Sequence, residues 1–203
     1  MGQCCSRPAY EPVEMTQIQA ALSNENVKNV KVVVFGRSAV GKTSFVRSAS
    51  GLACIHAPVP TQDFECTTLR WRVNHSEIRL ALWDTPGKGK YYNNLASAQR
   101  DILTHSVDGV VLVFDSFDKR SVDYIFEKFG EFVQEYGIDF EFVLIGSKKK
   151  HTKTPQYEEV VSLLGGKDQH YYIVDFTAPD AHVEVQYALG PMLGRIVARK
   201  NKS

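Results

Sequence analysis

The feature that most constrains the fold is an apolar run that ends in a glycine-rich loop, VVVFGRSAVGKTS, at residues 32–44. Gly36 to Thr43 matches the pattern G-x-x-x-x-G-K-[ST], in which backbone N–H groups surround phosphate. The pattern requires a strand before the loop and a helix after it, and the flanking residues predict both. We therefore predict a phosphate site between the first strand and the first helix of an α/β sheet.

Glycines let the backbone of this loop curl inward, and the positive end of the following helix adds to the same anion site. Lys42 is expected to reach the β- and γ-phosphates, and Thr43 to offer its hydroxyl to Mg²⁺. A glycine-rich turn with a chance lysine is the alternative, which the flanking elements disfavour. The predicted nucleotide-binding residues of the loop are Gly36, Ser38, Ala39, Val40, Gly41, Lys42, Thr43 and Ser44.

Apolar runs and helical patterns alternate along the rest of the chain. The predicted strands are 30–35, 64–74, 77–83, 109–115, 141–146 and 170–175, and the predicted helices are 42–50, 92–105, 119–136, 155–164 and 183–199. The second and third strands, separated by Asn-His-Ser, form a predicted hairpin. Gly190-Pro191 is expected to break or kink the last helix. The order predicts an α/β, P-loop NTPase three-layer fold: a six-stranded, mostly parallel sheet with one antiparallel edge strand and five helices.

The 203 residues, 43% of them hydrophobic, are enough for one domain. Residues 1–28 lack sustained periodicity and are expected to be a flexible, acylated anchor and spacer, with the domain at 29–200 and a tail at 201–203. A net charge of +1 gives no reason to expect a nucleic-acid partner. The four cysteines have neither metal-ligand nor disulfide spacing, which is typical of a reducing compartment.

A second motif, Asp84-Thr85-Pro86-Gly87, follows an alternating strand that ends at about residue 83. A carboxylate at the carboxyl end of a strand lies where ligands of such sheets bind, and it can hold Mg²⁺ directly or through water. Gly87 leaves its backbone N–H able to approach a γ-phosphate. By itself such an aspartate is usually a cap or turn residue, but its position after a phosphate loop favours the metal.

With these two motifs and this element order, the chain resembles a small GTPase of the Ras superfamily, in the Ras/Rab neighbourhood, over roughly residues 29–200. The resemblance implies guanine nucleotide and Mg²⁺ as ligands, with Thr61 as a γ-phosphate sensor and Thr43, Thr61 and Asp84 as the metal site. Thr61 could also simply stabilise a turn. The resemblance also implies base contacts from Lys148, Thr177 and Ala178. It further implies that residues 58–66 and 86–98 contact effectors and regulators.

Two departures from the family pattern concern hydrolysis and base recognition. Lys88 stands where relatives carry a glutamine that orients the attacking water, so we expect slow GTP hydrolysis and assign no catalytic residue. Ser147-Lys148-Lys149-Lys150 stands where relatives have N-K-x-D, and the aspartate that accepts hydrogen bonds from guanine is missing. Guanine preference is therefore in question. The basic run KKKHTK is either a solvated loop or a patch that attracts an anionic membrane.

The opening MGQCCS fits the N-myristoylation pattern, with Gly2 as the acceptor and Cys4 and Cys5 as sites for a second, palmitoyl chain. Two acyl chains are needed for stable anchoring. A frayed terminus with incidental thiols is the alternative. We expect a lipid-anchored protein on the cytoplasmic face of a plasma membrane or endomembrane.

Three functions fit these features. The leading hypothesis is a membrane-anchored, nucleotide-dependent signalling or trafficking switch. A pseudo-GTPase, a scaffold that binds partners with little or no nucleotide cycling, is favoured by Lys88 and by the altered base motif. A phosphate-loop kinase shares the first motif but requires an arginine-rich lid, which the sequence does not show.

Overall fold

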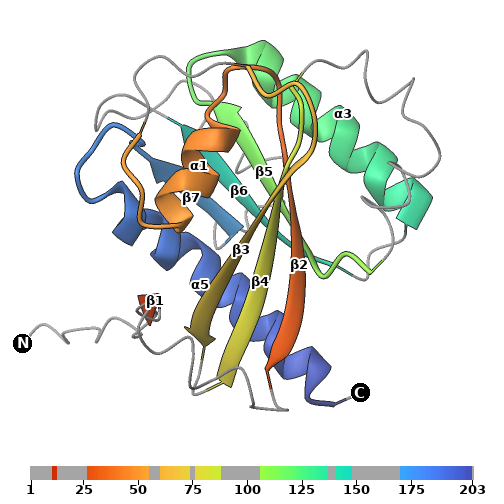
Figure 1. Cartoon of the computed structure of the whole chain (residues 1–203). Helices are drawn as coiled ribbons and strands as arrows, with labels where there is room; N and C mark the ends of the chain where they lie inside the picture. The colour runs from red at the N-terminus through yellow and green to blue at the C-terminus, as the bar shows by residue number, and fades with distance from the viewer. Residues whose placement is uncertain are drawn as a thin grey trace, which may run out of the picture.

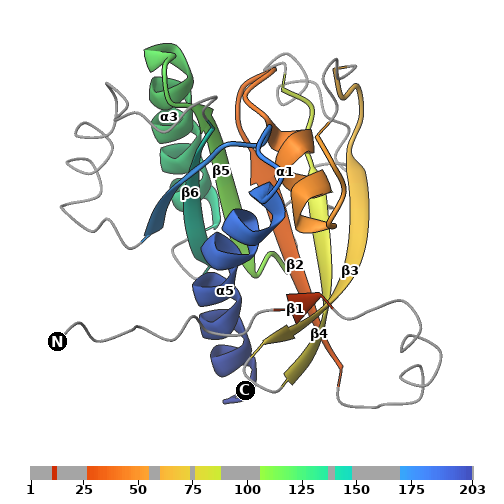
Figure 2. The same cartoon turned by 90° about the vertical axis from the view of Figure 1, so that its left-hand side faces the viewer.

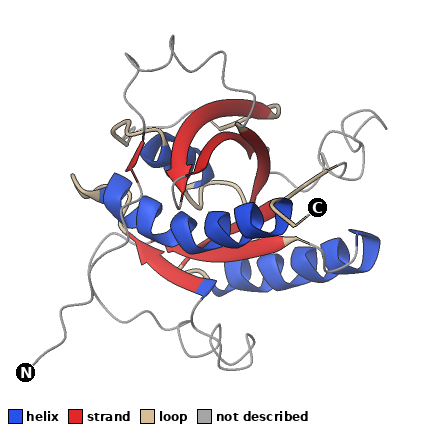
Figure 3. Ribbon diagram, turned by 90° about the horizontal axis from the view of Figure 1, so that it is seen from below, coloured by secondary structure: helices blue, strands red, loops and turns tan. Residues whose placement is uncertain are grey.

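The computed structural model describes residues 11–12, 27–54, 60–73, 76–87, 106–136, 140–147 and 170–202. These residues form three layers, in which α1 and α5 cover one face of a sheet and α3 covers the other (Figures 1 and 2). Viewed from below, the sheet runs between the two long helices (Figure 3). The α/β fold predicted from the sequence is confirmed.

The sheet has seven strands in the order β1-β3-β4-β2-β5-β6-β7 within the described residues. Its strands are β1 (Glu11–Pro12), β2 (Lys28–Phe35), β3 (Glu65–Val73), β4 (Ser76–Asp84), β5 (Gly109–Asp115), β6 (Glu141–Ser147) and β7 (Tyr171–Val174). The strands from β4 to β7 in this order are parallel, whereas β3 is antiparallel to β4 and β1 is antiparallel to β3. The helices are α1 (Lys42–Ala49), α3 (Lys119–Tyr136) and α5 (Ala181–Lys200).

Six of these strands and three helices lie where the sequence predicted them, with ends shifted by at most two residues. The seventh strand, β1, was not predicted; it falls within residues 1–28 and pairs outside β3, so β3 is not the edge strand expected from the sequence. The remaining predicted helices, 92–105 and 155–164, lie outside the described residues. No helix in the described part of the chain is long and apolar enough to cross a bilayer.

The last helix was predicted to break or kink at Gly190-Pro191. A break is wrong, because α5 continues through Pro191 to Lys200. A proline inside a helix costs about 3 kcal/mol, since it removes one backbone hydrogen bond and its ring meets the preceding turn. Leu189, Met192 and Leu193 on either side are at most 1% exposed, and burying each such side chain contributes about 1.5–3 kcal/mol. Packing on the sheet therefore outweighs the local cost.

Two apolar clusters lie on opposite faces of the sheet and form the core between the sheet and its helices. The strand β5, a continuous apolar run, contributes Val111 and Val113 to the cluster under α1 and α5, and Leu112 and Phe114 to the cluster under α3. The parallel strands end at one edge, where β2 leads into the loop before α1 and β4 ends at Asp84. The predicted phosphate and metal residues meet at this edge.

Candidate functional site

The loop between β2 and α1 has the curled backbone that a phosphate loop requires. Gly36, Ala39 and Gly41 have φ angles of 155°, 65° and 103°. A Cβ on Gly36 would overlap the carbonyl oxygen of Val113 and lie 2.9 Å from Cγ2 of Val40, so only glycine fits there. Val40 itself is 4% exposed and packs in the core, so its side chain anchors the loop and only its backbone can reach a ligand.

Lys42 is buried beneath this loop, with 6% of its surface exposed. Its Nζ donates hydrogen bonds to the carbonyl oxygens of Gly36, at 3.0 Å, and Arg37, at 2.8 Å. Burial lowers the pKa of Lys42 to about 8, while the nearby Asp84 carboxylate acts in the opposite direction. The amino group is therefore held at the start of the loop, where a phosphate would meet it.

Thr43, Thr61 and Asp84, the three predicted metal ligands, come together although they arise from α1, a loop and the end of β4. The Thr43 hydroxyl donates to Oδ2 of Asp84 at 2.6 Å and lies 3.0 Å from Oγ1 of Thr61. Thr61 also donates to Oδ2 of Asp84 at 3.5 Å. Two hydroxyls and one carboxylate are oxygen ligands of the kind that Mg²⁺ prefers.

The environment of Asp84 suits a bound cation, because the protein itself does not satisfy both of its carboxylate oxygens. Its side chain is 2% exposed, and its Oδ1 is buried with no hydrogen-bond partner. Burial raises the pKa of Asp84, although the hydrogen bond from Thr43 and the charge of Lys42 lower it. A buried carboxylate oxygen without a partner is costly, and a bound cation relieves that cost.

An open cavity of about 160 Å³ lies between the phosphate loop and these residues. Gly87 belongs to its wall, and a Cβ at this position would overlap Cα of Ser38 and lie 2.5 Å from the Ser38 nitrogen. The backbone after Asp84 is therefore packed directly on the loop. The lining residues are Ser38, Ala39, Gly41, Lys42, Thr43, Ser44, Pro60, Thr61 and Gly87.

Two of the predicted base contacts, Thr177 and Ala178, are not among the residues that line this cavity. Thr177 and Ala178 are held in a turn by Asp175: its Oδ1 accepts from the Thr177 hydroxyl at 2.6 Å, and its carbonyl accepts from the Ala178 N–H at 3.0 Å. Both residues line a second cavity, of about 310 Å³, together with Cys54 and Phe176. The Phe176 ring packs against the phosphate loop, because a Cβ on Gly41 would lie 3.0 Å from it.

Several sequence predictions fall on residues outside the described ranges, and the structure says nothing about them. They are Gly2, Cys4 and Cys5 of the lipidation motif, Lys88, Lys148 of the base motif, and most of the partner segment 86–98. Ser147, the first residue of the altered base motif, is described. It ends β6, and its carbonyl accepts a hydrogen bond from the Ser116 N–H at 3.1 Å.

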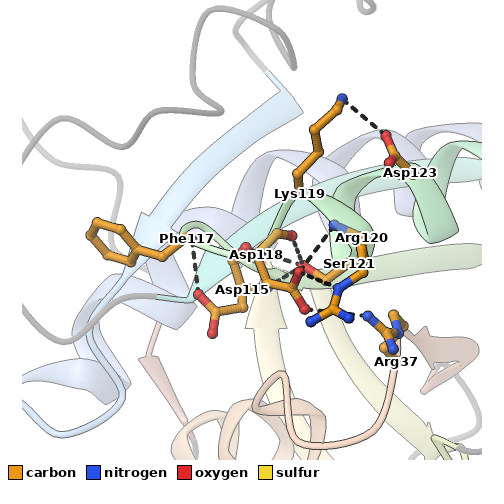
Figure 4. Close-up of polar contacts among 8 residues, drawn as sticks. All are labelled: Arg37, Asp115, Phe117, Asp118, Lys119, Arg120, Ser121 and Asp123. Atoms are coloured by element: carbon orange, nitrogen blue, oxygen red, sulfur yellow. Dashed lines mark hydrogen bonds and ion pairs between the residues drawn. The ribbon is translucent and has the colours of Figure 1, made fainter.

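An ion pair that sequence analysis did not predict ties the phosphate loop to the turn between β5 and α3. Nη1 of Arg37 lies 3.2 Å from Oδ2 of Asp118, and Figure 4 shows Arg37 reaching across to the start of α3. Asp118 also accepts a hydrogen bond from the backbone N–H of Arg120 at 3.1 Å and caps this helix. The two partners are 81 residues apart, so no local pattern could have revealed the pair.

A further tie holds the end of β4 in place. The buried hydroxyl of Thr85 donates to the carbonyl oxygen of Val34 at 2.7 Å. Because Val34 pairs with Asp84 in the parallel register of β2 and β4, this bond fixes the Asp84 carboxylate relative to the strand that leads into the phosphate loop. Thr85 was quoted in the sequence motif, but its tie to β2 became visible only in the structure.

Comparison with known proteins agrees with this geometry. The family model described as Ras family matches residues 31–182, about three quarters of the chain. Rho-related GTP-binding protein RhoE of Homo sapiens is 32% identical over 125 residues, which cover 62% of this chain and 48% of the relative. Ras-related protein Rab-11B of Dictyostelium discoideum is 26% identical over 143 residues, which cover 70% and 61%.

A third relative, Ras-related protein Rab-21 of Mus musculus, is 24% identical over 145 residues, or 69% of this chain and 63% of the relative. The match with RhoE spans about half of that protein's length, so the likeness concerns the domain described above. The matched region contains the phosphate loop, Thr61, Asp84 and Gly87. The chain therefore belongs to the Ras family, which confirms the resemblance inferred from its sequence motifs.

Proposed function

We propose that the protein is a membrane-anchored GTP-binding switch with slow intrinsic hydrolysis. The observation that carries the proposal is the meeting of Thr43, Thr61 and Asp84 beside the cavity under the phosphate loop, with one carboxylate oxygen of Asp84 left unpartnered. When bound there, Mg²⁺ neutralises phosphate charge and links the nucleotide to these three side chains. The name of the relative RhoE, a Rho-related GTP-binding protein, supports this assignment.

The switching step is proposed to depend on Thr61 and Gly87, since both line the cavity and both lie next to segments with a predicted partner role. A γ-phosphate in the cavity attracts the Gly87 N–H and, through the cation, the Thr61 hydroxyl. Its loss removes both attractions and releases residues 58–66 and 86–98. Partners that distinguish the two arrangements then read the nucleotide state.

Slow hydrolysis is proposed from Lys88, which stands one residue after Gly87 in the sequence. A lysine has three donors and no acceptor, so it cannot accept a hydrogen bond from the attacking water as a glutamine carbonyl does.

The membrane part of the proposal depends on Gly2, Cys4 and Cys5, whose spacing fits dual acylation. A Gly2→Ala variant should move from the membrane fraction to the soluble fraction of cells.

The same geometry leaves a pseudo-GTPase as the second candidate, favoured by the turn that carries Thr177 and Ala178. The N–H of Ala178, a predicted base contact, is engaged by Asp175, and both residues line a cavity separate from the phosphate cavity. A protein of this kind keeps the fold as an interaction module and cycles nucleotide little or not at all.

One experiment distinguishes the two candidates. The purified protein is denatured and the released nucleotide is identified by chromatography, and fluorescent GTP, GDP and ATP are then titrated with and without Mg²⁺. Saturable, Mg²⁺-dependent binding of guanine nucleotide supports the switch. Binding of adenine nucleotide in place of guanine nucleotide would make ATP the ligand of this site. Absence of saturable binding at millimolar Mg²⁺ would support the pseudo-GTPase, which acts only as an interaction module.

A further inference from the structure

The face of the sheet opposite α1 and α5 carries a cluster of cations over β2, β3 and β4. Alternation places the apolar residues of these strands, such as Trp71 and Leu80, in the core under α1 and α5. The residues between them point to the other face. The members of this basic face are Lys31, Arg70, Arg72 and Arg79.

The centre of the basic face is a pair of arginines that no acid neutralises among the described residues. Arg70 and Arg79 are directly opposite each other in the antiparallel register of β3 and β4, where like charges repel. Nη1 of Arg70 is buried and has no hydrogen-bond partner. Arg79 is exposed. Two guanidinium groups in this position provide a fork of donors for an anion.

Acidic groups around the cluster are few and already engaged. Glu77 lies opposite Arg72 in the register and forms an ion pair with it at 3.3 Å. Asp108, near Lys31, forms an ion pair with Nζ of Lys200 at 2.7 Å. Lys31 itself lies 5.6 Å from the ring centroid of Trp83. Glu11 lies opposite Arg72 in the register of β1 and β3 as well, so the excess positive charge of this face belongs to Arg70 and Arg79.

Residues 11–12 of the N-terminal segment form β1 at the β3 edge of the sheet, next to Arg72 of the basic face. In β1, Glu11 pairs with Arg72 and Pro12 with Trp71, at the lower end of β3 (Figures 1 and 2). Gly2 precedes Glu11 by nine residues, a stretch that spans at most about 30 Å. An acyl chain on Gly2 therefore holds the β3 edge of the sheet close to the lipid surface.

We propose that the basic face docks on the anionic headgroups of the membrane and so orients the domain. This inference rests on the acylation part of the proposed function for its orientation, and on Arg70 and Arg79 for its contact. The positive charge of this face fits either a lipid surface or an acidic protein. The acylated segment that precedes β1 favours the lipid surface, because it holds the domain near the membrane. Anionic lipid attracts each cation near its surface enough to change the partition coefficient about fivefold.

The test uses the full chain without acylation, mixed with vesicles of phosphatidylcholine alone or of phosphatidylcholine with phosphatidylserine, because phosphatidylserine gives the surface a negative potential. We expect sedimentation with the anionic vesicles only, and loss of binding between about 0.1 and 0.5 M salt. Arg70→Gln with Arg79→Gln should lower the partition coefficient about 25-fold. Arg79→Gln alone, at an exposed position, should lower it about fivefold and does not depend on how Arg70 is packed.

The matched control is Lys119→Gln with Arg120→Gln, which removes the same charge from the exposed start of α3. The control should bind like the unaltered chain, and equal losses in both double variants would overturn the basic face as the contact. Absence of binding to anionic vesicles would also overturn it, and displacement by soluble polyglutamate without vesicle binding would assign the face to an acidic protein. Membrane binding of the myristoylated chain to neutral vesicles and nucleotide titration report separately on the proposed function.

Discussion

At the residue scale, the site combines side chains that the sequence could predict with contacts that it could not. The loop residues and Asp84 were predictable because phosphate and metal chemistry restricts residue type and spacing. Thr61 was expected only through the family resemblance, and the structure brings it within 3.0 Å of Thr43. The Arg37–Asp118 pair joins residues 81 apart, and neither residue carries a local signal.

Asp84→Asn is expected to weaken Mg²⁺-dependent nucleotide binding about 10- to 100-fold, the range found when groups around a metal ion are removed. The stability of the protein without nucleotide should change little, because the lost attraction to Lys42 opposes the gain from removing a buried charge and the amide oxygen can still accept from Thr43. Isothermal titration with and without Mg²⁺ and urea denaturation measure the two effects. Asp123→Asn on the exposed side of α3 is the control and should alter neither.

Arg37→Gln is expected to accelerate nucleotide release while changing the free energy of unfolding by less than about 1 kcal/mol. The ion pair is partly exposed, with 38% and 35% of the two side chains accessible, so it contributes little to stability. Its position matters more, because the Arg37 carbonyl accepts from Lys42. Stopped-flow release of a fluorescent nucleotide checks this, and the exchanged pair Arg37→Asp with Asp118→Arg should restore slow release if the pair positions the loop. An unchanged release rate in Arg37→Gln would contradict the role.

At the element scale, strands and helices follow from local pattern wherever packing and propensity agree. The run Gly109–Asp115 and the helix Lys119–Tyr136 have the predicted ends because apolar period, turn residues and burial coincide there. Packing and propensity disagree at Pro191. Propensity predicts a break there, and the apolar face of α5 on both sides keeps the helix intact. The pairing of β1 with β3 depends on contacts 60 residues away in the sequence and has no local signal.

Pro191→Ala is expected to stabilise the domain by about 1–3 kcal/mol, because alanine restores the backbone N–H and removes the ring from the preceding turn. Urea denaturation followed by circular dichroism measures the change. Pro179→Ala, in the turn before α5, is the comparison. It should not raise the free energy of unfolding, because a proline in a turn lowers the conformational entropy of the unfolded chain and alanine loses that effect. A loss of stability in Pro191→Ala would show that the ring fills space the helix needs.

At the scale of the whole molecule, the order of strands explains why distant motifs share one site. The central strand β2 pairs with β4 on one side and with β5 on the other, so the phosphate loop, Asp84 and Asp118 meet at one edge of the sheet. Topology rules predict this convergence for a parallel sheet. They do not predict which side chains then make contact, such as the hydrogen bond from the Thr177 hydroxyl to Asp175.

Ligand binding at this edge should stabilise the whole domain, because the site joins α1, β2, β4 and two loops. At a GTP concentration 100 times the dissociation constant, with Mg²⁺ in excess, the expected gain is about 2.7 kcal/mol, visible as a rise in Tm by differential scanning fluorimetry. Omitting Mg²⁺ should remove most of the gain. A Tm that is the same with and without nucleotide would speak for the pseudo-GTPase.

The two carbonyl oxygens that accept from the amino group of Lys42 bear on how the folded protein behaves between the release of one nucleotide and the binding of the next. A departing polyphosphate leaves behind a cation that has two of its three donors paired in its own loop, so the Lys42 ammonium group keeps hydrogen bonds when the ligand diffuses away. The domain can then persist as a folded, ligand-free species long enough to be captured by a binding partner. Turnover of the ligand is therefore governed by the surrounding loops, and the fold does not have to open for it.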